Sequence, residues 1–157
     1  MSNVLTFKLG RAFSGHRLAY IYVIFSKASH VLYVGHTNQR GGPLCRLGQH
    51  LGDGENATFR QKLWTRDESS VEDIEDLELY AFPLPDEAAY LSIDRSYREG
   101  VEYLLQKRLE SEGARWKPYF DVVSEVRAPS TTSLTEIQAQ ADRFFNLVEV
   151  FYKLPAI

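Results

Sequence analysis

The sequence predicts an α+β fold: a small three-stranded antiparallel sheet flanked by helices, with an added C-terminal amphipathic helix. Three observations lead to this prediction. Two short runs rich in β-branched and aromatic residues are separated by a polar turn, a third run alternates apolar and polar residues, and later segments repeat apolar residues at helical spacing. A chain of 157 residues, of which 44% are apolar, is long enough to bury the core of one domain.

Three strands account for the predicted sheet. Residues 18–25 (LAYIYVIF) are uncharged, which is typical of a central strand buried on both faces. After a polar turn, residues 30–35 (HVLYVG) form the second, antiparallel strand of a hairpin, and residues 77–82 form the third. Weaker patterns suggest a short edge strand at 4–7 and an extended piece after Pro118.

Helices are expected between and after these strands. One begins at Pro43, because proline is favoured in the first turn of a helix, and ends near Gly52. A short basic helix follows at 59–66, and a longer helical pattern runs over 86–110. The residues of the longer pattern that would face the core are Ile93, Tyr97, Val101, Leu104 and Leu105.

The chain divides into a domain at 1–127, whose core spans about 18–123, and a C-terminal segment at 128–157. That segment opens with a polar linker, after which Ser133 and Glu136 have the spacing of a helix-capping box. One side of the following helix is apolar, so we expect it to dock on its own domain or to form a dimer interface. The apolar stripe comprises Leu134, Ile137, Ala141, Phe144, Phe145, Val148, Phe151 and Tyr152.

Charge is distributed unevenly along the chain. Residues 1–66 contain nine Lys or Arg and two Asp or Glu, a net charge of +7, whereas residues 67–157 have a net charge of −10. A basic half is compatible with binding phosphate groups, because the local field steers a polyanion more than the net charge does. The alternative is ordinary charge segregation between a strand-rich and a helix-rich half.

The composition favours a cytoplasmic protein that does not cross a membrane. Cys45 is the single cysteine, which excludes an intrachain disulfide and suits a reducing compartment. No apolar run approaches the roughly 18 residues that cross a bilayer. The first residues lack the apolar segment of a secretion signal.

Several short motifs occur in a fixed order and carry a resemblance to a known family. In chain order they are YIY at 20–22, YVG at 33–35, Arg46 with His50 four residues later, Glu102, and KPYFD at 117–121. Together they resemble the motifs of the GIY-YIG nucleases. The resemblance covers about residues 18–123, and five motifs in sequence are more specific than either tyrosine signature alone.

The sequence departs from the usual pattern of this family at four positions. Tyr20 stands where glycine is usual, so its bulk is expected to crowd the site. His36 fills a position that is often lysine or another polar residue, and Asp121 stands where asparagine is common. An insert rich in glycine moves Arg46 away from the YVG motif, so that Arg40 competes for the role of the family's arginine.

The resemblance implies a metal-dependent endonuclease that hydrolyses DNA phosphodiester bonds. Glu102 would hold one divalent cation, Mg²⁺ or Mn²⁺, that acts as a Lewis acid and stabilises the leaving group. Tyr22 would be the general base or orient the attacking water, and Tyr33 would hydrogen-bond the water or the phosphate. Arg46 would bind phosphate oxygens with two donors, and His50 would assist proton transfer.

These residues also have structural interpretations. The tyrosines could be ordinary strand aromatics, and Glu102 could pair with Arg98 one helical turn away. A catalytically silent interaction module and an RNA-cleaving effector are therefore the alternatives, and cleavage of both strands would favour a homodimer through the C-terminal helix. The residues expected to contact backbone phosphates around the site are Thr37, Asn38, Arg40, Arg60, Lys62 and Lys117.

Overall fold

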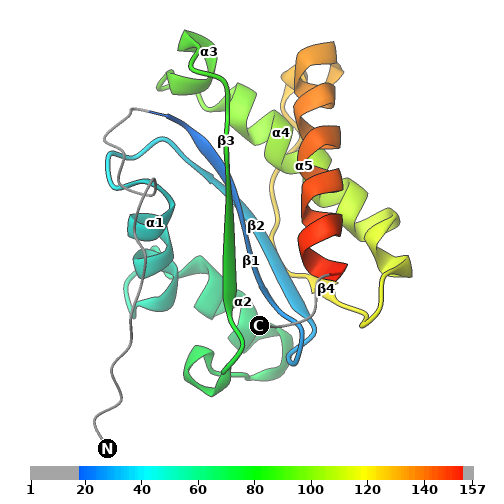
Figure 1. Ribbon diagram of the computed structural model, residues 1–157. Helices are drawn as coiled ribbons and strands as arrows, with labels where there is room; N and C mark the ends of the chain where they lie inside the picture. The colour runs from blue at the N-terminus through cyan, green and yellow to red at the C-terminus, as the bar shows by residue number, and fades with distance from the viewer. Residues whose placement is uncertain (1–17, 154–157) are drawn as a thin grey trace, which may run out of the picture.

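The computed structural model describes residues 18–153 and confirms the α+β fold (Figure 1). A four-stranded mixed sheet is flanked by helices, and the strand order is β3-β1-β2-β4. The predicted edge strand at 4–7 lies outside the described residues. The strands are β1 (Tyr20–Ser26), β2 (Val31–Thr37), β3 (Glu78–Pro83) and β4 (Asp121–Val122).

The hairpin predicted from the two apolar runs forms the centre of the sheet. β1 pairs antiparallel with both β2 and β3, and the six residues of β1 after Tyr20 are all buried. β4 adds a fourth strand, parallel to β2, that pairs only with Val31 and Leu32. Since β4 is so short, the second half of β2 is not paired with another strand on that side.

Helices cover both faces of the sheet, which gives three layers (Figure 1). α1 and α2 pack against the face that carries Tyr22, Ile24 and Tyr33, and α4 and α5 pack against the face that carries Val23 and Phe25. This division follows from the alternation of side chains along a strand. The helices are α1 (Gly42–Leu51), α2 (Thr58–Asp67), α3 (Ala88–Leu91), α4 (Ser96–Ser111) and α5 (Thr135–Lys153).

The helical pattern over 86–110 is interrupted, and the placement of Ile93 in the core is wrong. Ile93 lies between α3 and α4 with 97% of its surface exposed. The interruption has a local cause: two side chains accept hydrogen bonds from backbone N–H groups that would bond to backbone carbonyls in a continuous helix. The Ser92 hydroxyl accepts a hydrogen bond from the Asp94 N–H, and the Asp94 carboxylate accepts one from the Ser96 N–H.

The predicted capping box at the start of the last helix is also wrong. α5 begins at Thr135, and the Gln138 N–H donates to the Leu134 carbonyl, which makes Leu134 the residue before the first turn. Ser133 belongs instead to a short 3₁₀ turn, where its hydroxyl donates to the Ser130 carbonyl. The hydroxyl of Ser133 is therefore bonded within the 3₁₀ turn, and Ser133 is not the residue that caps α5.

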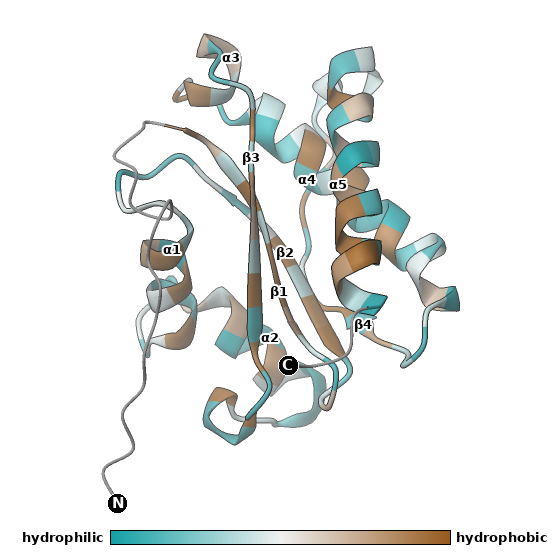
Figure 2. Ribbon diagram, viewed as in Figure 1, coloured by the Kyte–Doolittle hydropathy of each residue, from teal (hydrophilic) through white to brown (hydrophobic). Residues whose placement is uncertain are grey.

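The apolar stripe of α5 is covered within the chain. Six of its members are buried, and Leu134 and Phe151 are partly buried against the same cluster, whose apolar residues appear brown in Figure 2. Phe144 stacks on Phe82 of β3 with ring centroids 5.2 Å apart, and the Tyr152 hydroxyl donates to the Pro118 carbonyl. No helix in the described part of the chain is both long and apolar enough to cross a membrane.

The C-terminal segment packs closely against α4 at Gly100. A Cβ atom added to Gly100 would lie 2.7 Å from the Thr131 hydroxyl and 3.0 Å from a methyl group of Ile137. The same hydroxyl donates a hydrogen bond of 2.7 Å to the Ser96 carbonyl in the first turn of α4. The segment before α5 and α5 itself therefore hold the first half of α4 in place.

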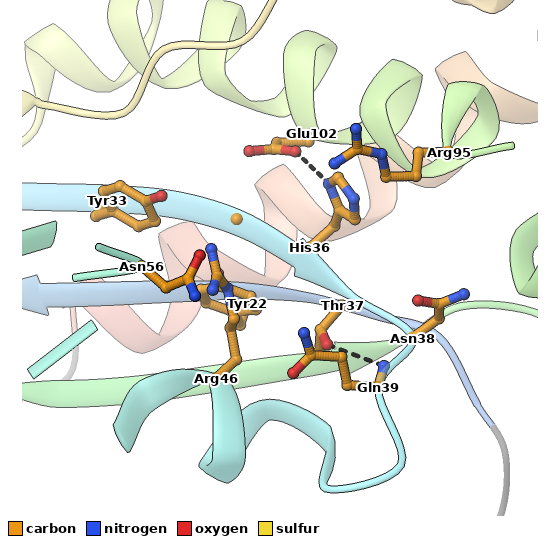
Figure 3. A pocket seen from close by; sticks show the side chains of 11 residues that line it. Tyr22, Tyr33, His36, Thr37, Asn38, Gln39, Arg46, Asn56, Arg95 and Glu102 are labelled. Carbon is orange, nitrogen blue, oxygen red and sulfur yellow. Dashed lines mark hydrogen bonds and ion pairs between the residues drawn. The ribbon is translucent and has the colours of Figure 1, made fainter. Parts of the chain in front are cut away.

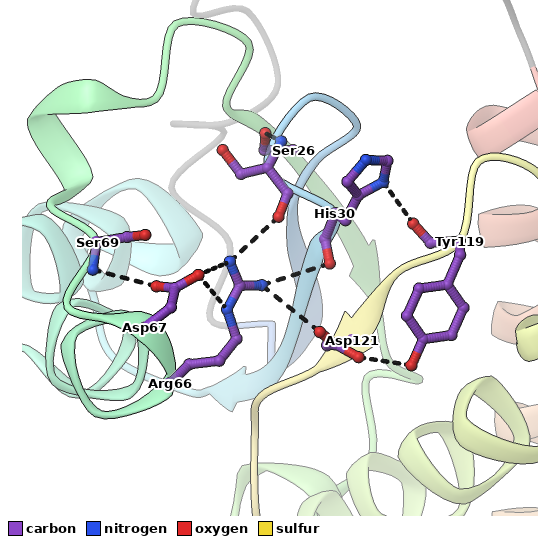
Figure 4. Close-up of polar contacts among 8 residues, drawn as sticks. Ser26, His30, Arg66, Asp67, Ser69, Tyr119 and Asp121 are labelled. Carbon is purple, nitrogen blue, oxygen red and sulfur yellow. Dashed lines mark hydrogen bonds and ion pairs between the residues drawn. The ribbon is translucent and has the colours of Figure 1, made fainter.

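Polar contacts around Arg66 hold the turn between β1 and β2 in place (Figure 4). The Arg66 guanidinium of α2 donates to the carbonyls of Ser29 and His30, and it lies 3.9 Å from a carboxylate oxygen of Asp121. The other carboxylate oxygen of Asp121 accepts a hydrogen bond from the Tyr119 hydroxyl. Asp121, which stands where asparagine is common in the resembled family, therefore joins β4 to α2 electrostatically.

Candidate active site

A pocket of about 280 Å³ lies beside the unpaired half of β2 (Figure 3). Four of the five residues predicted to be catalytic line it: Tyr22 from β1, Tyr33 from β2, Arg46 from α1 and Glu102 from α4. Because this side of β2 is free of β4, residues from both faces of the sheet reach the same cavity. The other residues that line the pocket are Gly35, His36, Thr37, Asn38, Gln39, Asn56 and Arg95.

The register of the hairpin places Tyr22 directly opposite Gly35. A Cβ atom on Gly35 would lie 2.3 Å from the Tyr22 hydroxyl oxygen and 2.4 Å from its Cζ, so the phenol ring occupies the space over the glycine. Tyr33 lies on the same face, with its ring centroid 6.5 Å from that of Tyr22. The position of the Tyr22 ring therefore requires glycine at position 35, in the YVG motif.

Gly35→Ala is expected to displace the Tyr22 ring and to lower the free energy of unfolding by about 1–3 kcal/mol, the usual cost of overpacking. Urea unfolding measures the effect. Gly48→Ala on α1 is the control, because nothing lies within 4 Å of its added Cβ. Alanine is favoured there by about 0.5–1 kcal/mol in a helix. Equal stability of the two variants would contradict the close approach of Tyr22 to Gly35.

His50 lies behind the pocket and is fully buried. Its Nε2 atom is 2.6 Å from the Tyr22 hydroxyl oxygen. Its Nδ1 atom is 2.8 Å from the Thr58 hydroxyl oxygen and 3.3 Å from the Phe59 backbone nitrogen. Thr58 is in turn 3.1 Å from the Tyr33 hydroxyl, so a hydrogen-bonded chain joins the two tyrosines through Thr58 and His50.

The backbone fixes the direction of this chain. The Phe59 N–H can only donate, so we assign Nδ1 of His50 as the acceptor. Burial lowers the pKa of His50 to about 4, and the nearby positive charge of Arg46 adds to the effect, so the imidazole is neutral at pH 7. A neutral imidazole that accepts at Nδ1 carries its proton on Nε2 and donates it to the Tyr22 oxygen.

The lowered pKa of His50 is expected to make the protein less stable in acid. Between about pH 6.5 and 4 an unfolded histidine binds a proton that the native His50 does not bind, so stability falls as the pH falls through this range. The difference amounts to about 3 kcal/mol. Urea unfolding at pH 7 and pH 4.5 measures this loss, which should be smaller in His50→Gln. An identical loss in both proteins would show that His50 is not held neutral.

Burial also raises the pKa of Tyr22 well above the ordinary value of a tyrosine. The neighbouring Tyr33 adds to the rise, whereas the charge of Arg46 and its hydrogen bond oppose it. The pKa of Tyr33 is raised as well, chiefly by burial. Both phenols are thus neutral at pH 7 in the protein alone.

Glu102 is held by His36 and does not pair with Arg98. An Oε2 atom of Glu102 lies 2.5 Å from Nδ1 of His36, and both side chains are largely buried. The Arg98 guanidinium, also buried, donates instead to the carbonyls of Tyr90 and Ser92. The interpretation of Glu102 as a partner of Arg98 is therefore wrong, because the carbonyls of α3 and of the residue that follows it bind the arginine.

Two arginines bring positive charge to the pocket. Arg46 reaches in from α1 (Figure 3). Its Nη1 atom donates a hydrogen bond of 2.7 Å to Gln49, three residues along the same helix. Arg95, the residue before α4, lines the opposite side of the pocket (Figure 3), and its Nε atom lies 3.6 Å from a carboxylate oxygen of Glu99 on α4. Arg46 lines the pocket, whereas Arg40 and Tyr20 are not among the described residues that line it.

The residues predicted to contact phosphates divide into two groups. Thr37 and Asn38 line the pocket, and Asn38 donates to the carbonyl of Leu91. The others lie away from the pocket, where Arg60 pairs with Glu72, Lys62 pairs with Glu125, and Lys117 borders a different hollow.

Comparison with known families gives a direct result. The sequence matches the GIY-YIG catalytic domain over residues 18–113, which is more than half of the chain. The chain belongs to the GIY-YIG family. No curated protein matches it, and no solved structure does.

The pocket of this GIY-YIG domain also includes or contacts residues to which no role in the site was assigned from the sequence. His36, Gln39, Asn56, Thr58 and Arg95 all line the site or join its hydrogen-bonded chain. The proximity of His36 to the YVG motif was a usable signal. Thr58 and Arg95 gave none, because they meet the site only through the packing of α2 and α4.

Proposed function

We propose that this GIY-YIG protein is a metal-dependent endonuclease that hydrolyses DNA phosphodiester bonds. One observation carries the proposal: Tyr22, Tyr33, Arg46 and Glu102 come from four elements and line a single pocket. The family is nuclease-type, which implies a nucleic acid as substrate. Four unrelated structural side chains have no reason to gather around one water-accessible cavity.

The residues of the pocket fit a divalent cation that keeps most of its water. The described residues contain no group of three or more histidine, cysteine or acidic side chains that could hold a metal. Glu102 provides one carboxylate at the pocket, and Mg²⁺ is commonly bound by one or two carboxylates and several waters. When bound, Mg²⁺ or Mn²⁺ supplies a Lewis acid and stabilises the leaving oxygen.

The arginines are the groups that bind the substrate phosphate. A guanidinium offers two parallel N–H donors to the oxygens of a phosphate, and Arg46 and Arg95 lie on opposite sides of the cavity. Binding energy from their charge depends on salt, because phosphate contacts release counterions. These contacts hold the backbone in place whatever its sequence.

Tyr22 is the group that takes the proton from the attacking water. Its pKa is too high in the protein alone, so the reaction requires groups that stabilise the phenolate. The raised pKa already includes the opposing effect of Arg46, so a bound cation would have to supply the further positive charge. The Nε2–H of His50 donates to the tyrosine oxygen and would also stabilise the phenolate. In this proposal His50 stabilises the phenolate by donation and does not take a proton from Tyr22.

Cleavage assays test the proposal. Supercoiled plasmid, branched DNA, single-stranded DNA and single-stranded RNA are each incubated with the protein and Mg²⁺ or Mn²⁺, and Glu102→Gln is the control. Metal-dependent cutting of DNA that the control lacks is the expected result. Cutting of RNA alone would replace DNA as the substrate, and no cutting of any substrate would overturn the proposal.

The alternative is a catalytically silent binding module, favoured by the raised pKa of Tyr22. Salt-dependent DNA binding without cleavage or metal requirement would support it. A cytoplasmic location and a homodimer belong to the main proposal. A dimer through α5 would use its exposed side, where Val150 is 57% exposed, because the apolar stripe is covered within the chain.

A further inference from the structure

We propose that His36 is a second protein ligand of the divalent cation, which it binds through Nδ1 beside the carboxylate of Glu102. The site would then combine a nitrogen and an oxygen donor, and it would favour first-row transition ions over Mg²⁺. This inference rests on the proposed nuclease site and deepens it, because it specifies the ion that the protein prefers.

The geometry of the pair carries the inference. Nδ1 of His36 and Oε2 of Glu102 are 2.5 Å apart, although the residues are 66 positions apart in the sequence. Two neighbouring ligand atoms of an octahedral ion lie about 3 Å apart when each is about 2.1 Å from the metal. An opening of about half an ångström makes room for the ion. The hydrogen between the two atoms then leaves, either because the neutral imidazole carries its proton on Nε2 instead of Nδ1 or because a proton is released to water.

The position of His36 indicates that it would bind the metal itself and would not merely hold Glu102 in place. An orienting residue contacts a metal ligand from behind and leaves the cavity to the ligand. His36 instead lines the same cavity as Glu102, and the two side chains have similar small exposures of 14% and 9%. A hydrated ion in this cavity lies next to both atoms.

The strand and the helix hold the two donors independently. His36 follows Gly35 on β2, on the face of the sheet that α4 covers, and Glu102 projects from α4 toward it (Figure 3). Rigid elements position ligands more accurately than loops do. The pair is therefore preorganised before the metal arrives.

The chemistry of the donors sets the expected selectivity. An imidazole nitrogen suits ions such as Co²⁺, Ni²⁺ and Zn²⁺ better than Mg²⁺, which prefers oxygen. Affinity for a given nitrogen and oxygen site rises from Mn²⁺ to Co²⁺ and Ni²⁺. We expect Mn²⁺ and Co²⁺ to bind more tightly than Mg²⁺, and to lose that advantage when the nitrogen is removed.

Pulsed electron paramagnetic resonance of Mn²⁺ bound to the full chain tests the assignment, because it detects nitrogen atoms directly bonded to the metal. The wild-type protein should show coupling to a histidine nitrogen. In His36→Ala that coupling should disappear, and the affinity for Mn²⁺ should fall at least about tenfold. His30→Asn is the control, since His30 lies at the hairpin turn and contacts Tyr119, and it should change neither quantity.

The result for the wild-type chain decides the question even where the variant folds poorly. Mn²⁺ bound without nitrogen coupling would overturn the inference, and so would coupling that persists in His36→Ala. The readout requires no cleavage. A protein that shows the coupling but cuts nothing would overturn the nuclease proposal alone, whereas cleavage without coupling would overturn only the role of His36.

Discussion

Glu102→Gln is expected to lower the rate of metal-dependent cleavage by about 10²–10³-fold while the chain remains folded. The amide keeps the shape of the side chain but removes the negative charge that would hold the proposed cation. Stabilisation of transition-state charge of this kind is worth about 10²–10³-fold per group. The amide also retains an oxygen that can accept a hydrogen bond from His36.

Single-turnover cleavage at saturating protein measures the rate, and thermal unfolding measures the fold. Glu110→Gln is the matched control, because Glu110 lies on the same helix, is exposed, and pairs only with nearby side chains including Lys107. It should cleave at the rate of the unaltered protein. A Glu102→Gln protein that is folded and cleaves within threefold of that rate would remove Glu102 from the mechanism.

Tyr22→Phe is expected to lower the cleavage rate by about 10²–10⁴-fold, the usual contribution of a general base. The change also removes the acceptor of the His50 Nε2–H, which lies in a buried site. A buried donor without a partner costs about 1–3 kcal/mol, so this variant should unfold at lower urea concentration as well.

Tyr152→Phe controls for the loss of a tyrosine hydroxyl as such. Its hydroxyl donates to the Pro118 carbonyl, far from the pocket, so the variant should lose some stability and keep its activity. Tyr33→Phe separates the two tyrosines of the site. Should Tyr33→Phe abolish cleavage while Tyr22→Phe retains it, the roles of the two phenols would be exchanged.

The sheet could be predicted from the sequence because its strands carry local signals. Residues 18–25 are uncharged and rich in β-branched and aromatic side chains, and residues 77–82 begin with alternating apolar and polar side chains. Both patterns are typical of strands that pack against a core, so the strands could be recognised locally. The split between α3 and α4 could not be predicted in the same way. It depends on the side chains of Ser92 and Asp94 taking over backbone hydrogen bonds, which interrupts a continuous helical pattern.

The site could be predicted in part, for a similar reason. The resemblance supplied Tyr22, Tyr33, Arg46 and Glu102, and the structure places all four around one pocket. The orientation of His50 could not be predicted, because it depends on the Phe59 N–H, a backbone group with no signature in the sequence.

The close packing at Gly100 shows that the residues that line the pocket span a shorter part of the chain than the residues that share its core. A fragment of residues 18–113 contains every residue that lines the pocket, and it coincides with the matched family domain. Yet Ile137 packs on Gly100, only two positions before Glu102, so the fragment would expose the core face of α4. The proposed domain boundary at 127/128 therefore separates two segments of the chain whose buried residues belong to one core. The helix that carries Glu102, the proposed metal ligand, thus depends for its packing on a segment that contributes no residue to the pocket. We therefore expect the smallest stably folded fragment to include α5.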